Sequence, residues 1–219
     1  MFDNPAYTIA EAARYLKLAP ATLRSWFIGR SYPKRDGSGY FKPLIPFADP
    51  AHRLLSFTNL VEAYVLRALR QNHNVSITGL RTALDYAEQE LKIPRLLMKN
   101  DLLTTTGDLF LQYYGNLINL SQSGQLAMRK ILDVYLARVE WEIELPSRLY
   151  PYIVGVDTQK VIVIDPAIGF GRPILIHKGI STAIIVDRID AGESVESLAE
   201  DYDLKPEEIE MAIVYERAA

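Results

Sequence analysis

Two short amphipathic helices separated by three residues lie near the N-terminus, and this spacing constrains the fold more than any other feature. Thr8 can cap the first helix, and Glu11 three residues later completes a capping box. Residues 17–19 interrupt the apolar pattern, and Pro20 stands where the first turn of a new helix tolerates proline. The second helix then runs to Phe27. The sequence therefore predicts a helix-turn-helix.

The second of these helices has the side chains of a DNA-reading helix. We expect Leu23 and either Trp26 or Phe27 to face inward. The outward-facing residues are then Ala21, Thr22, Arg24 and Ser25. Arg24 can grip a phosphate or pair with guanine, while the two hydroxyls can donate to phosphates or base edges. These residue types predict a helix that enters the major groove.

A basic segment, residues 30–42, follows the second helix and contains Asp-Gly and Gly-Tyr steps. Such steps predict a tight β-hairpin, which here resembles the wing of a winged helix. The predicted wing residues in contact with DNA are Arg30, Lys34, Arg35, Tyr40 and Lys42. Basic side chains at a wing would contact the DNA backbone and add salt-sensitive affinity. The alternative is a solvated basic loop.

Charge is divided unevenly along the chain. Residues 1–99 hold 14 Lys or Arg against 8 Asp or Glu, a charge of +6, whereas residues 100–219 carry −9. A basic N-terminal part suits a polyanion such as DNA, and an acidic C-terminal part would be repelled by phosphates. The two parts are thus expected to face different partners, although chance segregation of charge would give the same numbers.

The middle of the chain has both helical and strand-like patterns. Apolar residues at helical spacing predict helices at residues 59–71 and 77–91, and a helix of about five turns at 124–141. The Gly115-Asn116 step predicts a hairpin within residues 109–120, because such a pair suits a two-residue turn. β-Branched runs within residues 152–164 predict a second hairpin that turns at residues 157–159.

Three short helices are predicted at the C-terminus, and the last two have helix-turn-helix spacing. They cover residues 183–191, 195–202 and 207–215, with Ser194 as the cap of the middle one. Between Asp187 and Arg217 there are 11 acidic and 3 basic residues. We therefore expect this unit to bind DNA poorly and to bind a protein, or else only to complete the fold.

These segments carry two family resemblances. The strings Tyr-Thr-Ile-Ala-Glu-Ala-Ala and Ala-Pro-Ala-Thr-Leu-Arg-Ser-Trp-Phe, with the hairpin and two helices, make residues 6–91 similar to a MerR-type DNA-binding domain. The proline-rich stretch at 41–50 departs from that pattern. Residues 160–217, with Gly-Arg-Pro-Ile-Leu-Ile-His-Lys-Gly-Ile-Ser-Thr and Asp-Arg-Ile-Asp-Ala-Gly-Glu-Ser-Val-Glu, resemble a bacterial VapB-like antitoxin module. The whole chain resembles the longer antitoxins of this family.

The resemblance implies a function. It implies an antitoxin of a type II toxin–antitoxin system that binds double-stranded operator DNA and neutralises a PIN-like ribonuclease toxin encoded nearby. The helix at 124–141 could form the seam of a homodimer. The alternative is a ligand-sensing MerR-like transcriptional regulator with a pocket lined by Tyr113, Tyr114, Trp141 and Tyr150.

The expected fold class is mainly α with small β-hairpins, an α+β chain in three parts. These are a MerR-like winged helix-turn-helix at 1–99, a linking hairpin and long helix at 100–159, and an acidic three-helix antitoxin-type domain at 160–219. Cysteine is absent, histidines lack metal-ligand spacing and no catalytic constellation is visible. We therefore expect no enzymatic activity, cofactor or metal. Without a signal peptide pattern or a spanning run, a cytoplasmic location is expected.

Overall fold

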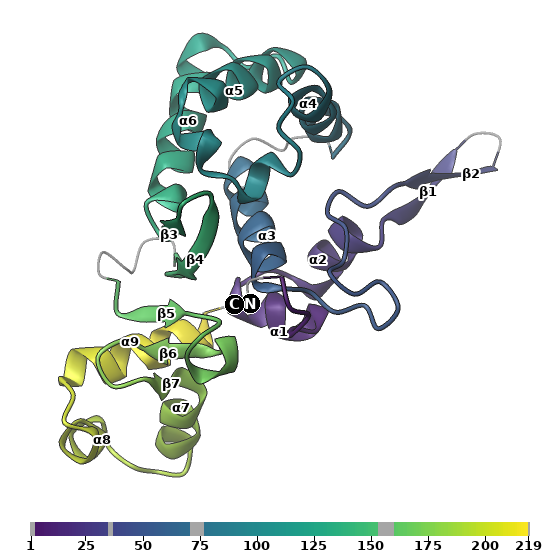
Figure 1. Cartoon of the computed structure of the whole chain (residues 1–219). Helices are drawn as coiled ribbons and strands as arrows, with labels where there is room; N and C mark the ends of the chain where they lie inside the picture. Colours follow the sequence, from purple (N-terminus) through teal and green to yellow (C-terminus); the bar gives the residue numbers. More distant parts are fainter. Residues whose placement is uncertain (1–2, 35–36, 71–76, 153–159, 219) are drawn as a thin grey trace.

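The computed structural model describes residues 3–34, 37–70, 77–152 and 160–218. The helix-turn-helix and a projecting hairpin lie on one side of a long central helix, α3, and three further helices pack at its far end (Figure 1). The C-terminal unit lies next to the first helix, and both termini come close together there (Figure 1). The α-helices are α1 Ile9–Tyr15, α2 Pro20–Phe27, α3 Phe57–Arg70, α4 Ile77–Gln89, α5 Thr105–Leu117, α6 Gln122–Leu136, α7 Thr182–Asp190, α8 Val195–Tyr202 and α9 Pro206–Arg217. The strands are β1 Arg30–Lys34, β2 Gly37–Phe41, β3 Val139–Glu142, β4 Leu145–Leu149, β5 Ile162–Ile164, β6 Pro173–Leu175 and β7 Ile180–Ser181.

The predicted helix-turn-helix is confirmed, and its two helices begin at the predicted residues. The Thr8 side chain accepts a hydrogen bond from the backbone of Glu11, and the Glu11 carboxylate accepts one from the backbone of Thr8. Pro20 occupies the first position of α2. Trp26 and Phe27 are both buried, rather than only one of them. Both aromatic side chains therefore fix α2 to the core and leave its opposite face free.

The predicted hairpin after α2 is also confirmed. Strands β1 and β2 pair in antiparallel register from Arg30 opposite Phe41 to Lys34 opposite Gly37. The proline-rich stretch that follows returns along α2, since the backbone amides of Leu44 and Ile45 donate to the carbonyl oxygen of Trp26 at 2.7 and 3.1 Å. The hairpin thus remains attached to the recognition helix at its base.

The hairpin predicted within residues 109–120 is wrong, because this segment is helix α5. Thr104 caps it, and Phe110 and Tyr114 bury one helical face. Gly115 lies inside the helix, where an added Cβ would come within 2.6 Å of the Gln125 side chain. The glycine therefore allows α6 to approach α5 closely, and the left-handed residue that follows the helix is Asn119.

The long helix predicted at residues 124–141 ends early. Helix α6 stops at Leu136, and Val139 to Glu142 form β3, which pairs with β4. Val139 is buried and Trp141 packs partly against the same core, the alternation of a strand. At the end of this segment Val139 continues the helical spacing, but it also starts a strand-like alternation. Pairing with β4 makes this part a strand instead of a helix.

The second predicted hairpin lies partly outside the described residues, since these exclude 153–159. Its later half contains β5, which pairs with β4 through Leu149 and Ile164 and with β6 through Ile162 and Leu175. Strands β3 to β7 therefore make one antiparallel sheet in sequential order. Asp165 ends β5 as a turn residue, accepting from the backbone of Ala167 at 2.8 Å.

Two main hydrophobic clusters meet at this sheet, where Ile164 of β5 belongs to one and Ile162 of the same strand belongs to the other. One runs from Tyr7 to Ile164, and the other joins Val161 and Leu175 to the inner faces of α7, α8 and α9. The predicted three C-terminal helices are confirmed, with Ser194 capping α8. The fold class, mainly α with small antiparallel sheets, is confirmed as well. The domain division at residues 99 and 159 stays a prediction.

The C-terminal unit contacts the helix-turn-helix through α1. The Tyr215 hydroxyl donates to the carbonyl oxygen of Tyr15 at 2.8 Å, and both tyrosines are buried. The Lys17 ammonium lies 4.1 Å from the centroid of the Tyr215 ring. Burial lowers the pKa of Lys17 to about 8. Among the helices described, none is long and apolar enough to cross a membrane.

Candidate nucleic-acid interface

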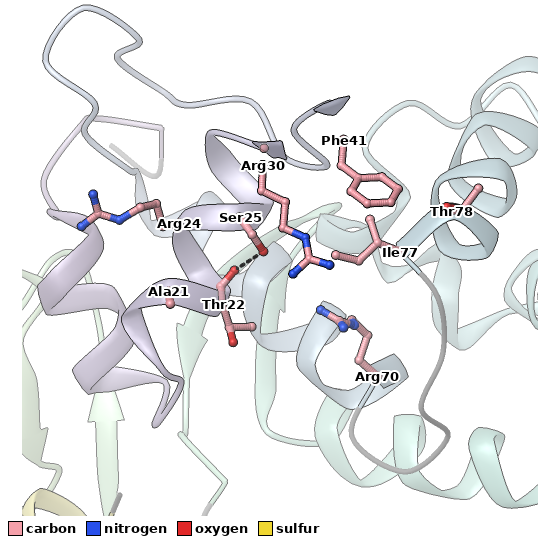
Figure 2. A pocket seen from close by; sticks show the side chains of 10 residues that line it. Ala21, Thr22, Arg24, Ser25, Arg30, Phe41, Arg70, Ile77 and Thr78 are labelled. Atoms are coloured by element: carbon pink, nitrogen blue, oxygen red, sulfur yellow. Dashed lines mark hydrogen bonds between the residues drawn. The ribbon is translucent and has the colours of Figure 1, made fainter. Parts of the chain in front are cut away.

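A cavity of about 730 Å³ opens between α2, the base of the hairpin, the end of α3 and the start of α4 (Figure 2). The sequence predicted α2 and the hairpin for this face but not the ends of α3 and α4. Its lining residues are Ala21, Thr22, Arg24, Ser25, Gly29, Arg30, Phe41, Arg70, Ile77 and Thr78. Five of the nine predicted DNA-binding residues are therefore brought together here, and three arginines give the cavity a positive charge.

The polar side chains of α2 differ in what they can still bind. Ser25 donates its hydroxyl proton to the backbone carbonyl of Thr22 at 2.7 Å, so its oxygen is left as an acceptor (Figure 2). Arg24 is exposed and extends away from the space between the other two arginines (Figure 2). The Arg24 guanidinium and the Thr22 hydroxyl have no hydrogen-bond partner among the residues that the structure describes, and both suit phosphates or base edges.

Gly29 fixes the angle between α2 and the hairpin. Its φ of +84° lies in the left-handed region, and a Cβ there would come within 2.7 Å of the Tyr40 hydroxyl and closer still to the Phe41 carbonyl oxygen. The Tyr40 hydroxyl donates to the carbonyl oxygen of Ile28, although the side chain is 55% exposed. Tyr40 thus ties the hairpin to the end of α2 and still presents its ring to solvent.

Of the other predicted wing residues, Lys42 does not line the cavity. Lys42 is exposed just after β2, and its carbonyl oxygen accepts a hydrogen bond from Arg81 of α4. Arg81 also donates to the Pro43 carbonyl oxygen at 3.0 Å, so α4 braces this end of the hairpin. Lys34 is the last residue of β1. Its side chain and the whole of Arg35 are outside the part of the chain that the structure describes.

Arg70 is the functional candidate that the sequence analysis missed. It is the last residue of α3, and its guanidinium carbon lies 5.7 Å from the ring centroid of Trp26, on the inner side of α2. Burial lowers its pKa, and the charge of the nearby Arg30 acts in the same direction. A basic residue at a helix C-terminus is ordinary, so only the packing of α3 against α2 marks this one.

The C-terminal unit carries its acidic side chains on a different surface. Arg188 pairs with Glu193 and Asp201 at 2.5 Å each, which neutralises part of the charge. Glu208 of α9 does not face outward. It is buried, accepts from the backbone of Lys205 at 3.0 Å and pairs with His177. The exposed acidic residues on α8 and α9 include Glu196, Glu200, Glu207 and Glu210.

The four aromatic residues considered for an effector pocket are packing residues. Tyr114 is fully buried in the large cluster, and Tyr113 and Trp141 pack against that cluster. Tyr113 stacks on Tyr86 with ring centroids 4.0 Å apart. Tyr150 belongs to a separate small cluster, and its hydroxyl donates to Glu140 at 2.8 Å. These contacts account for all four rings.

Two family models match separate parts of the chain. Residues 5–84 match a model described as "Putative DNA-binding HTH domain", which covers the helix-turn-helix, the hairpin, α3 and much of α4. Residues 162–215 match "Protein of unknown function (DUF433)", which covers β5 to α9. The N-terminal match supports the nucleic-acid interface, and the C-terminal match coincides with the acidic unit.

Curated proteins and a solved structure match almost the whole chain. The protein named "Putative antitoxin VapB45" from Mycobacterium tuberculosis is 27% identical, over 97% of this chain and 94% of its own length. "Uncharacterized protein Rv2308" from the same organism is also 27% identical, over 98% and 91%. The crystal structure of Rv2018 from Mycobacterium tuberculosis has a TM-score of 0.69 at 26% identity, over 97% of this chain and 99% of that one. These comparisons confirm the resemblance to VapB-like antitoxins and the fold class.

Proposed function

We propose that this chain, which resembles a VapB-type antitoxin along nearly its whole length, binds operator DNA through α2 and the β1–β2 hairpin and neutralises a PIN-like ribonuclease toxin encoded nearby. The observation that carries DNA binding is the cationic cavity beside α2, where Thr22 and Arg24 keep free donors. In this proposal α2 enters the major groove, and Arg24 reads a base or grips a phosphate. The hairpin contacts the adjacent backbone through Lys42 and the wing residues Lys34 and Arg35.

DNA binding is tested by titrating the full chain against a duplex of the sequence upstream of its own gene and against a scrambled duplex. Arg24→Ala should weaken binding to the upstream duplex by about 1–3 kcal/mol. Lys130→Ala is the matched control, because it removes an exposed positive charge from α6. Equal binding to both duplexes, or equal effects of the two substitutions, would contradict operator reading by α2.

Toxin binding is assigned to the acidic unit. The exposed glutamates of α8 and α9 complement a basic cleft such as a ribonuclease needs for its substrate. Because Tyr215 is buried against α1 and β5 lies inside the sheet, removing this unit would expose core, so substitution is the better test. Changing Glu196, Glu200, Glu207 and Glu210 together to Gln should weaken capture of the co-expressed neighbouring gene product.

The control for toxin capture carries Glu88→Gln and Glu90→Gln. Both residues are acidic and exposed, and they lie at the end of α4, far along the chain from the antitoxin-like unit. If the fourfold variant retains full capture while its circular dichroism matches the parent, the acidic surface is not the toxin site. If neither variant nor parent captures the neighbouring product, the antitoxin assignment itself fails.

A homodimer is the assembly proposed for paired operator half-sites. Helices α5 and α6 expose Leu109, Leu126 and Val134, with Leu126 65% exposed. Exposed apolar side chains on these two packed helices suit a self-association seam. Sedimentation velocity should therefore give a dimer, and Leu126→Lys should shift it toward monomer. A parent protein that stays monomeric at tens of micromolar, with or without DNA, would remove the argument for paired half-sites.

A further inference from the structure

Arg70 is a half-buried cation with no anionic partner among the described residues. Its Nε atom is buried and makes no hydrogen bond there, and the groups that act on its charge are the Tyr114 hydroxyl and Arg30. Arg95 shows the usual arrangement for a half-buried arginine, because it donates to Glu62 from two nitrogens at 2.8 and 3.0 Å and its pKa is raised. An arginine removed from water without such a partner is unfavourable by itself.

The second cation at this place is Arg30. It begins β1, and its guanidinium carbon lies 5.7 Å from the ring centroid of Phe41. The guanidinium groups of Arg30 and Arg70 point toward one another across the cavity (Figure 2). Two like charges converging in this way raise each other's energy, and an anion placed between them would reverse that effect.

The lining of the cavity that the two arginines share fits an oxyanion. It also contains the hydroxyl residues Thr22 and Thr78 and the small residue Ala21. The first turn of α4 also faces the cavity, where backbone N–H groups carry partial positive charge. Planar guanidinium groups match the geometry of phosphate oxygens and bind them through two parallel hydrogen bonds.

We propose that Arg30 and Arg70 together bind one phosphate group in this cavity. The phosphate source favoured by the position beside α2 is the DNA backbone next to the bases that α2 reads, and to that extent the assignment rests on the proposed function. A free phosphate-bearing molecule has the same chemistry and would use the same two arginines. In either case Arg70, which no wing or recognition-helix pattern marks, is a ligand-binding residue rather than a packing residue.

The first test measures the site without DNA. Inorganic phosphate is titrated into the ¹⁵N-labelled full chain, and the buried Arg70 Nε–H signal, assigned by its loss in Arg70→Gln, is followed by NMR. Phosphate should shift this signal, and chloride at the same ionic strength should not. Arg30→Gln should abolish or strongly weaken the shift, whereas Lys130→Gln should leave it unchanged.

The second test measures DNA binding over a range of salt concentrations. Arg70→Gln and Arg30→Gln should each weaken binding about tenfold to upstream and scrambled duplexes alike and lower the salt slope by about one. The double variant should lose little more than either single variant, because both residues hold the same phosphate. Arg70→Gln should retain or raise the melting temperature, whereas a structural arginine would lower it.

The outcomes separate the two assignments. A phosphate shift together with weakened DNA binding supports the DNA backbone as the source, and a shift with unchanged DNA binding supports a free phosphate ligand. If phosphate shifts the Arg70 Nε–H signal but the protein binds no DNA, the phosphate site is supported and the proposed function is contradicted. If phosphate causes no shift and the two variants bind DNA as the parent does, the phosphate site is refuted even where Arg24→Ala confirms operator binding.

Discussion

The contact between the C-terminal unit and the α1 region includes one buried hydroxyl, which allows a sharp test. Tyr215 is fully buried, and its hydroxyl donates to the carbonyl oxygen of Tyr15 at 2.8 Å. That carbonyl belongs to the last residue of α1, where helix carbonyls lack a partner within the helix. Tyr215→Phe removes the donor and leaves a buried acceptor unpaired. The expected loss in the free energy of unfolding is about 1–3 kcal/mol.

The matched control is Tyr114→Phe. Tyr114 is equally buried, yet its hydroxyl makes no hydrogen bond among the described residues. Removing it should leave the free energy of unfolding unchanged or slightly higher, because an unpaired buried polar group is lost. Urea unfolding followed by far-UV circular dichroism gives both values. A loss below about 0.5 kcal/mol for Tyr215→Phe, or an equal loss in both variants, would refute the assigned hydrogen bond.

Three further predictions concern strain, pH and a buried ion pair. Gly29→Ala should lower the free energy of unfolding by about 1–3 kcal/mol and weaken DNA binding, because an added Cβ meets both backbone strain and close neighbours. Gly37 also has a positive φ but has open space around it, so in thermal melts Gly37→Ala should lose only the stability that backbone strain costs. The pKa of Lys17 falls from 10.5 to about 8 on folding, so between these values the unfolded chain holds the extra proton and stability rises with pH. Lys17→Met should therefore be more stable than the parent below pH 8 and lose this advantage toward pH 10; a constant difference across urea titrations would contradict it. Glu62→Ala removes the close carboxylate partner of the half-buried Arg95, which keeps only the exposed Asp3 at 3.8 Å, and should cost about 3–5 kcal/mol. Glu144→Ala, at an exposed pair, should cost less than about 1 kcal/mol by the same assay.

Local signals in the sequence predicted the helix boundaries best. The capping box at Thr8 and Glu11, the proline at the start of α2 and the Ser194 cap each form within four residues of the chain. Their hydrogen bonds involve only neighbouring backbone, so they do not depend on the rest of the fold. This is why the helix-turn-helix and the three C-terminal helices were predictable from sequence.

Sequence patterns that are compatible with two different secondary structures led to wrong predictions. Gly115 followed by Asn116 is typical of a hairpin turn, but here the glycine serves close packing against Gln125 within a helix. Val139 continues the helical spacing of Tyr135 and Leu136, but together with Trp141 two residues later it also fits the period of a strand. In both cases tertiary contacts decided the outcome, and one sequence does not contain them.

Only the part of the candidate site that the helix-turn-helix contributes, the face formed by α2, was predictable from the sequence. Thr22 and Arg24 lie on the outward face that the helical period of α2 dictates. Arg70 lies more than forty residues later, and its position beside α2 follows from the path of α3 through the core. The charge and periodicity of α3 do not indicate that Arg70 lies beside α2, so this half of the cavity was recognised only from the structure.

The position of the acidic unit explains how a chain of net charge −3 can present a surface for DNA. The unit contacts the α1 region through a neutral hydrogen bond from Tyr215 and through the half-buried Lys17. The cavity proposed to face DNA lies across α2, and the hairpin projects away from the acidic unit (Figure 1). A helix with its side chains is about 10 Å across, close to the Debye length at physiological salt, so the exposed glutamates are largely screened from this cavity. Under the proposed function, the arginines beside α2 would therefore act on DNA phosphates nearly independently of the acidic surface, and two partners of opposite charge would be able to bind the two ends of the molecule at once.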